Sequence, residues 1–201
     1  MDEPTPWPRS DSTIFDPEPS QLSASLAWAQ GRAYGYEEGY RRAAEILFRE
    51  MAERGRSLDM LVFPFAFLWR HSIELQLKHL IERCGVLLDD DEDRPPLHHR
   101  LVGLWEEAKR RIVEICGEQI GMEGVDRVVA ELDQLDPEST GFRYPTDRKG
   151  RPNLSSPPAA LDLPNFHLRM QEVQMFLDCA NTDLAHQIDC LGELPRGQAS
   201  W

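Results

Sequence analysis

The sequence has few cysteines, and none of them has the spacing that metal sites use. Its four cysteines, Cys84, Cys116, Cys179 and Cys190, include no Cys-x-x-Cys pair, so we expect buried, reduced thiols in a cytoplasmic protein. The sequence also lacks a phosphate-binding glycine loop, a GxSxG elbow, an HExxH motif and paired carboxylates in a recognisable metal motif. We therefore expect no bound metal and no cofactor.

Long apolar runs are missing as well. The densest apolar stretch, Leu61–Trp69, contains Pro64 and is far shorter than the roughly 20 residues that a membrane span needs. The start of the chain, Met1-Asp-Glu-Pro, has neither the basic residues nor the apolar stretch of a secretory signal. No membrane association is expected.

Positive charge is scarce. Lys and Arg number 22 against 35 Asp and Glu, which gives a net charge of −13. Such a surface repels nucleic acid on average, because binding strength comes mostly from neutralised phosphates. A non-specific nucleic-acid binder is thus disfavoured, and any contact with RNA must be local or helped by a basic partner.

The hydrophobic pattern predicts an all-α fold, an antiparallel bundle of about five helices in one domain of a 201-residue chain. We expect a disordered arm rich in proline and acid at 1–19, the bundle at 20–191 and a flexible tail at 192–201. The expected helices cover about 20–54, 57–84, 97–119, a shorter stretch around 125–135, and a last segment from near Pro164. Gly55 and Gly85 are the expected ends of the first two helices.

The first expected helix carries a row of small residues at every fourth position. Gly31, Gly35, Gly39 and Ala43 would let another backbone approach closely, either inside the bundle or at a dimer seam. The pattern leaves both possibilities open.

A long irregular loop, from Asp136 to about Leu163, precedes the last helix. It contains five prolines and two glycines, and a loop of this length is usually functional or disordered. The last helix repeats its apolar residues in steps of four and three, which is typical of a bundle seam. These residues are Phe166, Met170, Val173, Leu177, Ala180 and Leu184.

The second helix carries two polar arcs between apolar flanks. At 100° per residue, Arg70, His71, Glu74 and Lys78 share one arc of about 100°. This arc either lines a cleft, with Glu74 holding two cations for a phosphate, or forms a surface ladder of weak ion pairs. The other arc holds Gln76, His79 and Arg83. Periodicity does not decide which arc faces inward.

Two histidines, His98 and His99, open the third expected helix. A histidine acts as general acid or base near neutral pH, and near a helix start it also serves as a cap or packs. Both roles stay open.

The most basic short segment follows Phe142 and carries Arg143, Tyr144, Arg148, Lys149 and Arg151. Aromatic rings beside cations suit stacking on bases together with phosphate contact. In the alternative interpretation the aromatics pin the loop to the bundle, and Arg143 pairs with an acidic neighbour such as Asp136 or Glu74.

Three strings of the sequence resemble prokaryotic proteins of the HEPN family. They are Phe67-Leu-Trp-Arg-His-Ser-Ile-Glu-Leu-Gln-Leu-Lys-His-Leu-Ile81, His99-Arg-Leu-Val-Gly-Leu-Trp105, and Asp136-Pro with Phe142-Arg-Tyr-Pro145. The resemblance spans about 58–180. It implies a helical bundle, commonly a homodimer with a cleft near the two-fold axis. Many members are metal-independent ribonucleases of toxin–antitoxin or anti-phage defence systems.

The usual catalytic motif of that family is an Arg followed four to six residues later by a His on one helix. Here the only close match is Arg94 with His99, and Pro95 and Pro96 interrupt it. The resemblance therefore implies a substitute catalytic set, or an inactive member. The substitute set is Arg70, His71, Glu74, Lys78 and His99, with RNA held by Arg143, Tyr144, Arg148, Lys149 and Arg151.

Two hypotheses follow. The first is a metal-independent endoribonuclease of a defence or toxin–antitoxin module, with His99 or His71 as acid or base. The second is a non-catalytic interaction or regulatory subunit, in which Arg70, Glu74 and Lys78 form a buried structural network. Both allow a homodimer and a partner protein encoded by a neighbouring gene.

Overall fold

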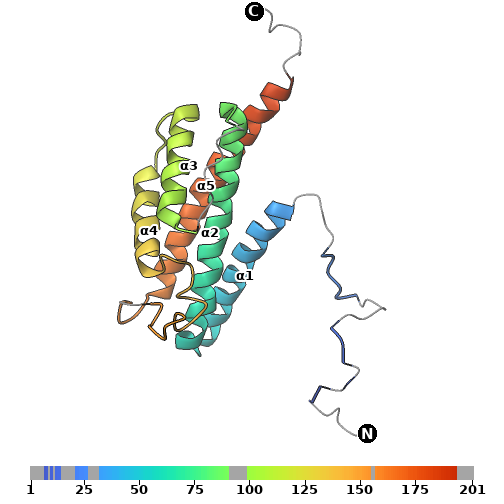
Figure 1. Cartoon of the computed structure of the whole chain (residues 1–201), viewed down its shortest axis with the longest axis vertical. Helices are drawn as coiled ribbons and strands as arrows, with labels where there is room; N and C mark the ends of the chain where they lie inside the picture. The colour runs from blue at the N-terminus through green and yellow to red at the C-terminus, as the bar shows by residue number, and fades with distance from the viewer. Residues whose placement is uncertain are drawn as a thin grey trace, which may run out of the picture. The chain divides into compact units, whose positions relative to one another are not determined.

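The structure is a computed structural model, and its described residues are 7–8, 10, 12–14, 21–26, 32–90, 99–154 and 157–193. The chain forms two units, Met1–Arg32 and Ala33–Trp201. The described residues before Arg32 contain no helix and no strand. The rest of the described chain is an all-helical bundle, as the sequence predicts (Figure 1).

Five helices lie within the described residues: α1 (Arg32–Arg54), α2 (Leu58–Leu88), α3 (Leu101–Cys116), α4 (Met122–Leu135) and α5 (Leu163–Glu193). The only β pairing in those residues is an isolated bridge between Thr146 and Pro152. The prediction of about five helices and no sheet is thus confirmed.

Neighbouring helices of the bundle run both antiparallel and parallel to one another. Along α2 and α5, Phe65 contacts Phe166 and Gln76 bonds Asp178, so these two helices run the same way. The helix α3 runs with them, while α1 and α4 run opposite (Figure 1). The direction of α3 follows from its contacts with α2, because His99, just before α3, contacts Arg70, and Arg111, near the end of α3, lies beside Gly85.

The core surrounds α2, which packs against both α3 and α5. Its apolar flanks are buried, with Trp69, Ile73 and Leu77 fully enclosed. The seam predicted for α5 is buried too, since Met170, Val173, Leu177 and Leu184 lie in the same core, with Phe166 at its edge and Ala180 packed against it. Burial on two sides explains why the polar residues of α2 also lie inside the molecule.

The prediction that α2 stops at Gly85 is wrong. The helix continues to Leu88, and Asp89 then takes the left-handed conformation that ends it. A Cβ at position 85 would lie 3.6 Å from Nη1 of Arg111, so this glycine lies in the packing surface between α2 and α3. Tertiary contact thus overrides the helix-stopping tendency of glycine.

The first helix begins later than its pattern predicts. Residues 21–26 are not helical, and α1 starts at Arg32. Leu22 and Leu26 are almost fully exposed, and a helix without a buried face gains too little to form. Of the small-residue row, Gly31 lies outside the described residues. At Gly39 a Cβ would meet nothing within 4 Å, so the first of the two possibilities, close packing inside the bundle, does not hold at this position.

The third helix is shorter than expected at both ends. Residues 99 and 100 precede it in non-helical conformation, and Gly117, at a φ of 75°, ends it. The fourth and fifth helices end and begin where predicted, at Leu135 and Leu163. The described part of the segment between them is irregular, as the prolines indicate. His99 therefore belongs to the connection before α3, where it can lie against α2.

Candidate functional site

The first polar arc of α2 faces inward around Arg70, which is fully buried. Its guanidinium donates from Nη1 to Oε2 of Glu74 (2.9 Å), from Nη2 to the backbone oxygen of His99 (2.7 Å) and from Nε to that of Asp136 (3.2 Å). The side chain thus ties together α2, the segment before α3 and the segment after α4. The interpretation of this arc as an exposed ladder of ion pairs is wrong for Arg70 and Glu74.

The buried carboxylate of Glu74 links this interior to the surface. Its Oε1 accepts from Nζ of Lys78 and lies next to Nδ1 of His99, each at 2.7 Å. The His99 side chain is 70% exposed, whereas Glu74 is 1% exposed. A carboxylate that holds Nδ1 fixes the ring orientation and leaves Nε2 for a proton transfer.

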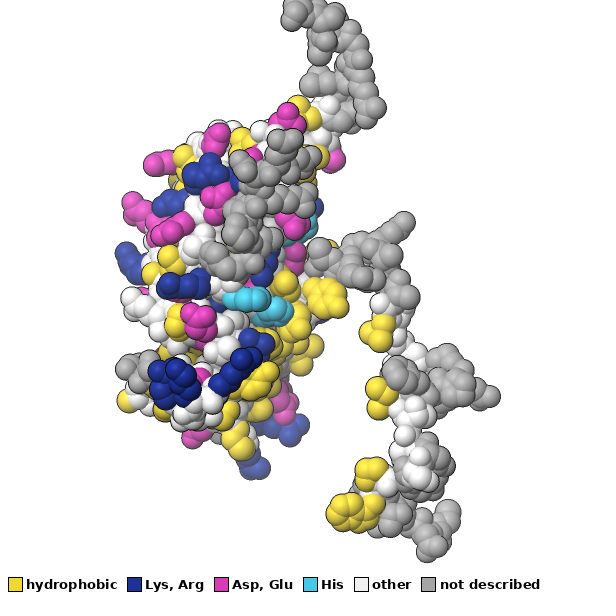
Figure 2. Space-filling model, viewed as in Figure 1, with side chains coloured by type: hydrophobic (Ala, Val, Ile, Leu, Met, Phe, Trp, Pro, Cys, Tyr) yellow, Lys and Arg dark blue, Asp and Glu magenta, His cyan; other side chains and the backbone are white. Residues whose placement is uncertain are grey.

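The rim next to this pair is aromatic and cationic. The ring of His71 stacks on Phe67, with 5.4 Å between centroids, and meets Tyr40 of α1 edge-on at 4.4 Å. The guanidinium of Arg143 lies over Phe67 at 5.6 Å and over Tyr144 at 5.5 Å. Figure 2 shows a molecular face on which histidine side chains reach the surface beside hydrophobic ones, with Lys and Arg nearby. Residues of the string at 67–81 and of the string at 142–145 therefore lie in one neighbourhood.

The charge states of this neighbourhood suit acid–base chemistry. Burial lowers the pKa of His71, and so do the charges of Lys78 and Arg143, although Glu74 acts in the opposite direction. Burial alone would raise the pKa of Glu74, but the hydrogen bonds from Lys78 and His99 outweigh it and hold that pKa below the ordinary value. The arrangement keeps Glu74 ionised and His71 neutral near pH 7.

Acidification is expected to destabilise the protein through Glu74. A carboxyl whose pKa is lower in the folded state contributes stability above its unfolded pKa, here 4.5, and loses it as the pH falls through the folded pKa. The free energy of unfolding should therefore fall below about pH 4.5, and it should fall less in Glu74→Gln. Urea titrations over a pH series measure this slope. The exposed Glu114→Gln is the matched control, and equal slopes for all three proteins would contradict the expectation.

The loop after α4 is fixed by Asp136. Its Oδ1 accepts from the backbone nitrogens of Thr140 (2.9 Å) and Gly141 (2.8 Å), and its Oδ2 lies 3.8 Å from Nε of Arg70. A Cβ at Gly141 would meet the side chain of Leu154 and lie 3.2 Å from Oδ1 of Asp136, so a larger residue here requires Leu154 to shift. The expectation that Arg143 pairs with Asp136 or Glu74 is wrong, because its Nε donates to the backbone oxygen of Ser139 at 2.7 Å.

The basic residues at the end of this loop are all exposed. Arg148 and Lys149 are exposed, and so is Arg151, although it pairs with Asp147 at 2.6 Å. An open cavity of about 920 Å³ beside them is lined by Tyr144, Arg148 and Arg151, among others. The loop thus offers an exposed ring and exposed cations at one hollow of the surface.

The second polar arc of α2 also faces inward, toward α1 and α5. Nδ1 of His79 lies 3.0 Å from Oε1 of Glu37, and Arg83 donates to Nε2 of His79 and to the backbone oxygen of Asn181. The sequence did not predict this network. The i,i+4 spacing of His79 and Arg83 indicates that the two side chains are neighbours. Periodicity alone does not show whether they face the interior or the solvent.

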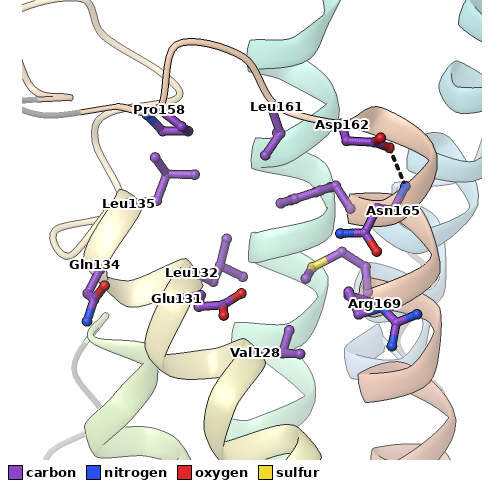
Figure 3. Close-up of a pocket in the computed structure, with 12 residues that line it drawn as sticks. Val128, Glu131, Leu132, Gln134, Leu135, Pro158, Leu161, Asp162, Asn165 and Arg169 are labelled. Carbon is purple, nitrogen blue, oxygen red and sulfur yellow. Dashed lines mark hydrogen bonds between the residues drawn. The ribbon is translucent and has the colours of Figure 1, made fainter.

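Another cavity, of about 290 Å³, lies between α4, α5 and the chain that precedes α5 (Figure 3). Leu132 and Leu135 face Leu161 across it, and Asp162 caps α5 through the backbone nitrogen of Asn165 at 2.8 Å. None of the residues lining it belongs to the set singled out from the sequence. Its apolar walls and capping contact serve the packing of α5.

Two of the sequence motifs can be placed only in part, because His98 and Arg94, with Pro95 and Pro96, lie outside the described residues. All five residues of the substitute catalytic set are described. Arg70, Lys78 and His99 bond the carboxylate of Glu74, and His71 of the same arc packs against Phe67 and Tyr40. Tyr40 and Phe67 were not predicted, although the i,i+4 spacing of Phe67 and His71 is the signal for their stacking.

The fold and site together define an all-α bundle with a buried carboxylate that orients an exposed histidine. Comparisons with protein-family models, with curated proteins and with solved structures find no match. Within the described ranges, no helix has the length and apolar character of a bilayer-spanning segment. Among the same residues, His, Cys, Asp and Glu form no group of three or more that could hold a metal ion.

Proposed function

We propose that this chain is a HEPN-like, metal-independent endoribonuclease. The observation that carries the proposal is the 2.7 Å contact between Oε1 of the buried Glu74 and Nδ1 of the exposed His99. A carboxylate–histidine pair beside cations is suited to phosphodiester cleavage through the ribose 2′-hydroxyl. The resemblance of the strings at 67–81, 99–105 and 142–145 to that family supports the same chemistry.

In the proposed reaction His71 is the base and His99 the acid. Neutral His71 takes the proton of the 2′-hydroxyl, the 2′-oxygen forms a bond to phosphorus, and the bond from phosphorus to the 5′-oxygen breaks. His99, whose Nδ1 lies 2.7 Å from Oε1 of Glu74, gives a proton to the leaving 5′-oxygen. The products are a 2′,3′-cyclic phosphate and a 5′-hydroxyl.

The cations have separate tasks in this proposal. Arg143 and Lys78 stabilise the charge that grows on the phosphate, and Tyr144 with Arg148, Lys149 and Arg151 holds the neighbouring nucleotides. Arg70 is a positioning residue, because its buried guanidinium is fully engaged with Glu74 and two backbone oxygens. The RNA contact is local, in keeping with the net charge of −13.

The test is cleavage of a mixed-sequence RNA by the purified protein in EDTA. We expect fragments ending in 2′,3′-cyclic phosphate, with DNA of the same sequence left intact because it lacks the 2′-hydroxyl. A folded protein that cuts no RNA under these conditions would end the proposal. We further propose a cytoplasmic homodimer, working in a toxin–antitoxin or anti-phage module with a partner from a neighbouring gene.

The second candidate is a non-catalytic interaction or regulatory subunit. The observation that favours it is the ion pair between Arg70 and Glu74. Both side chains are buried and bond each other, so neither charge is free for a ligand. A buried pair of this kind needs no substrate to explain it. This candidate predicts RNA that stays intact, with Arg70 acting on stability alone.

A further inference from the structure

A second polar cavity, of about 400 Å³, lies between α1, α2 and α5. Among the side chains that line it are Gln76 of the second polar arc, Gln174, Asp178 and Asn181 of α5, and Glu37 and Glu38 of α1. It shares no lining residue with the proposed nuclease site. Its volume is within the range of small-molecule sites.

Three side chains at this cavity have buried amide oxygens that accept no hydrogen bond from the described residues. Gln76 and Gln174 are only 1% and 6% exposed, and each directs its amide nitrogen to the carboxylate of Asp178. Their orientation leaves both Oε1 atoms, and Oδ1 of Asn181, without a hydrogen-bond partner in the described part of the chain. Because unpaired buried oxygens are costly, a cavity that gathers three of them is suited to a ligand that brings donors.

The cations at the cavity are already engaged. Arg41 bonds Glu38 and Glu45, and Arg83 bonds His79 and the backbone oxygen of Asn181. What remains is acceptor capacity, together with the exposed carboxylate of Asp178, which solvent reaches directly. The net charge of −13 also raises the local concentration of small cations.

We propose that this cavity binds a small organic cation that carries a guanidinium or primary ammonium group. The cationic end pairs with Asp178 in place of the amide nitrogens of Gln76 and Gln174. The two amide groups then turn over, so that their oxygens accept from the N–H groups of the ligand. The volume of about 400 Å³ suits a free small molecule. The site is separate from RNA cleavage and does not depend on it.

The probes are agmatine and putrescine, titrated into the full-length protein by calorimetry and by thermal melting. We expect saturable heat and a higher melting temperature with at least one of them, and none with butanediol, which has the carbon chain of putrescine without its amines. Asp178→Asn should weaken binding about tenfold or more, because it removes a charge-assisted hydrogen bond. Asp189→Asn, an exposed change of equal charge on α5, should leave binding unchanged.

Gln174→Leu provides a second variant that does not depend on charge. It removes an unpaired acceptor together with the hydrogen bond to Asp178, so we expect weaker binding, and the melting temperature without ligand shows that the variant is folded. The proposal is wrong if neither amine binds at millimolar concentration, or if both variants bind as the wild type does. Equal weakening by Asp178→Asn and Asp189→Asn would also overturn it, because that result indicates attraction to the acidic surface alone. Because binding is read without RNA, failure here leaves the proposed nuclease untouched.

Discussion

His99→Ala is expected to lower the rate of RNA cleavage by about 10²- to 10⁴-fold, the usual contribution of a general acid. The melting temperature should hardly change, because the side chain is 70% exposed and Lys78 still bonds Glu74 after its removal. Single-turnover cleavage in EDTA measures the first quantity, and thermal denaturation measures the second. A large loss of rate at unchanged stability is the signature of a residue that acts on the substrate.

The matched control for this variant is His186→Ala. His186 is an exposed histidine of α5, and its loss should change neither rate nor stability. Full activity of His99→Ala would remove the proposed acid. Loss of activity in both histidine variants would indicate general damage to the preparations, and unchanged activity in both would indicate a contaminating nuclease.

Arg70→Ala is expected to lower the free energy of unfolding by about 3–5 kcal/mol, since it leaves Oε2 of the buried Glu74 carboxylate without its partner while Lys78 bonds only Oε1. It also removes the two backbone contacts that hold the segments before α3 and after α4. Urea denaturation at pH 7 measures the change. Both candidate functions predict this loss, and they differ only in whether the folded wild type cuts RNA.

Arg110→Ala is the surface control for this variant. Arg110 is 54% exposed and makes the same i,i+4 type of ion pair, with Glu114 at 3.1 Å. Its loss should cost less than about 1 kcal/mol, because exposed pairs contribute little. If Arg70→Ala is no more destabilising than Arg110→Ala, the buried cluster is not the structural centre described above.

Local pattern was enough to predict most of the fold. The apolar steps along α5 predict its buried seam, and the prolines between Asp136 and Leu163 predict an irregular loop. The helix ends were harder. Gly85 is helical although its residue type indicates a stop, and Arg111, from a distant part of the sequence, lies beside it.

The site could be predicted only as far as one helix extends. A period of 3.6 puts Arg70, Glu74 and Lys78 on one arc, and the structure has them in contact. Helical periodicity contains no information on how the segment before α3 is aligned with α2. That alignment brings His99 to Glu74 from 25 residues away. Periodicity could not orient α2 either, and here both polar arcs are enclosed because the helix packs on two sides.

The three acceptors of Arg70 have a consequence for how the chain opens. They come from positions 4, 29 and 66 residues away, so one guanidinium closes two long rings of backbone. Opening either ring leaves the buried guanidinium of Arg70 without one of its hydrogen-bond partners. The segments before α3 and after α4 should therefore detach together. The histidine and the basic loop would then be gained or lost as one cooperative unit, and a half-assembled active surface would be scarcely populated.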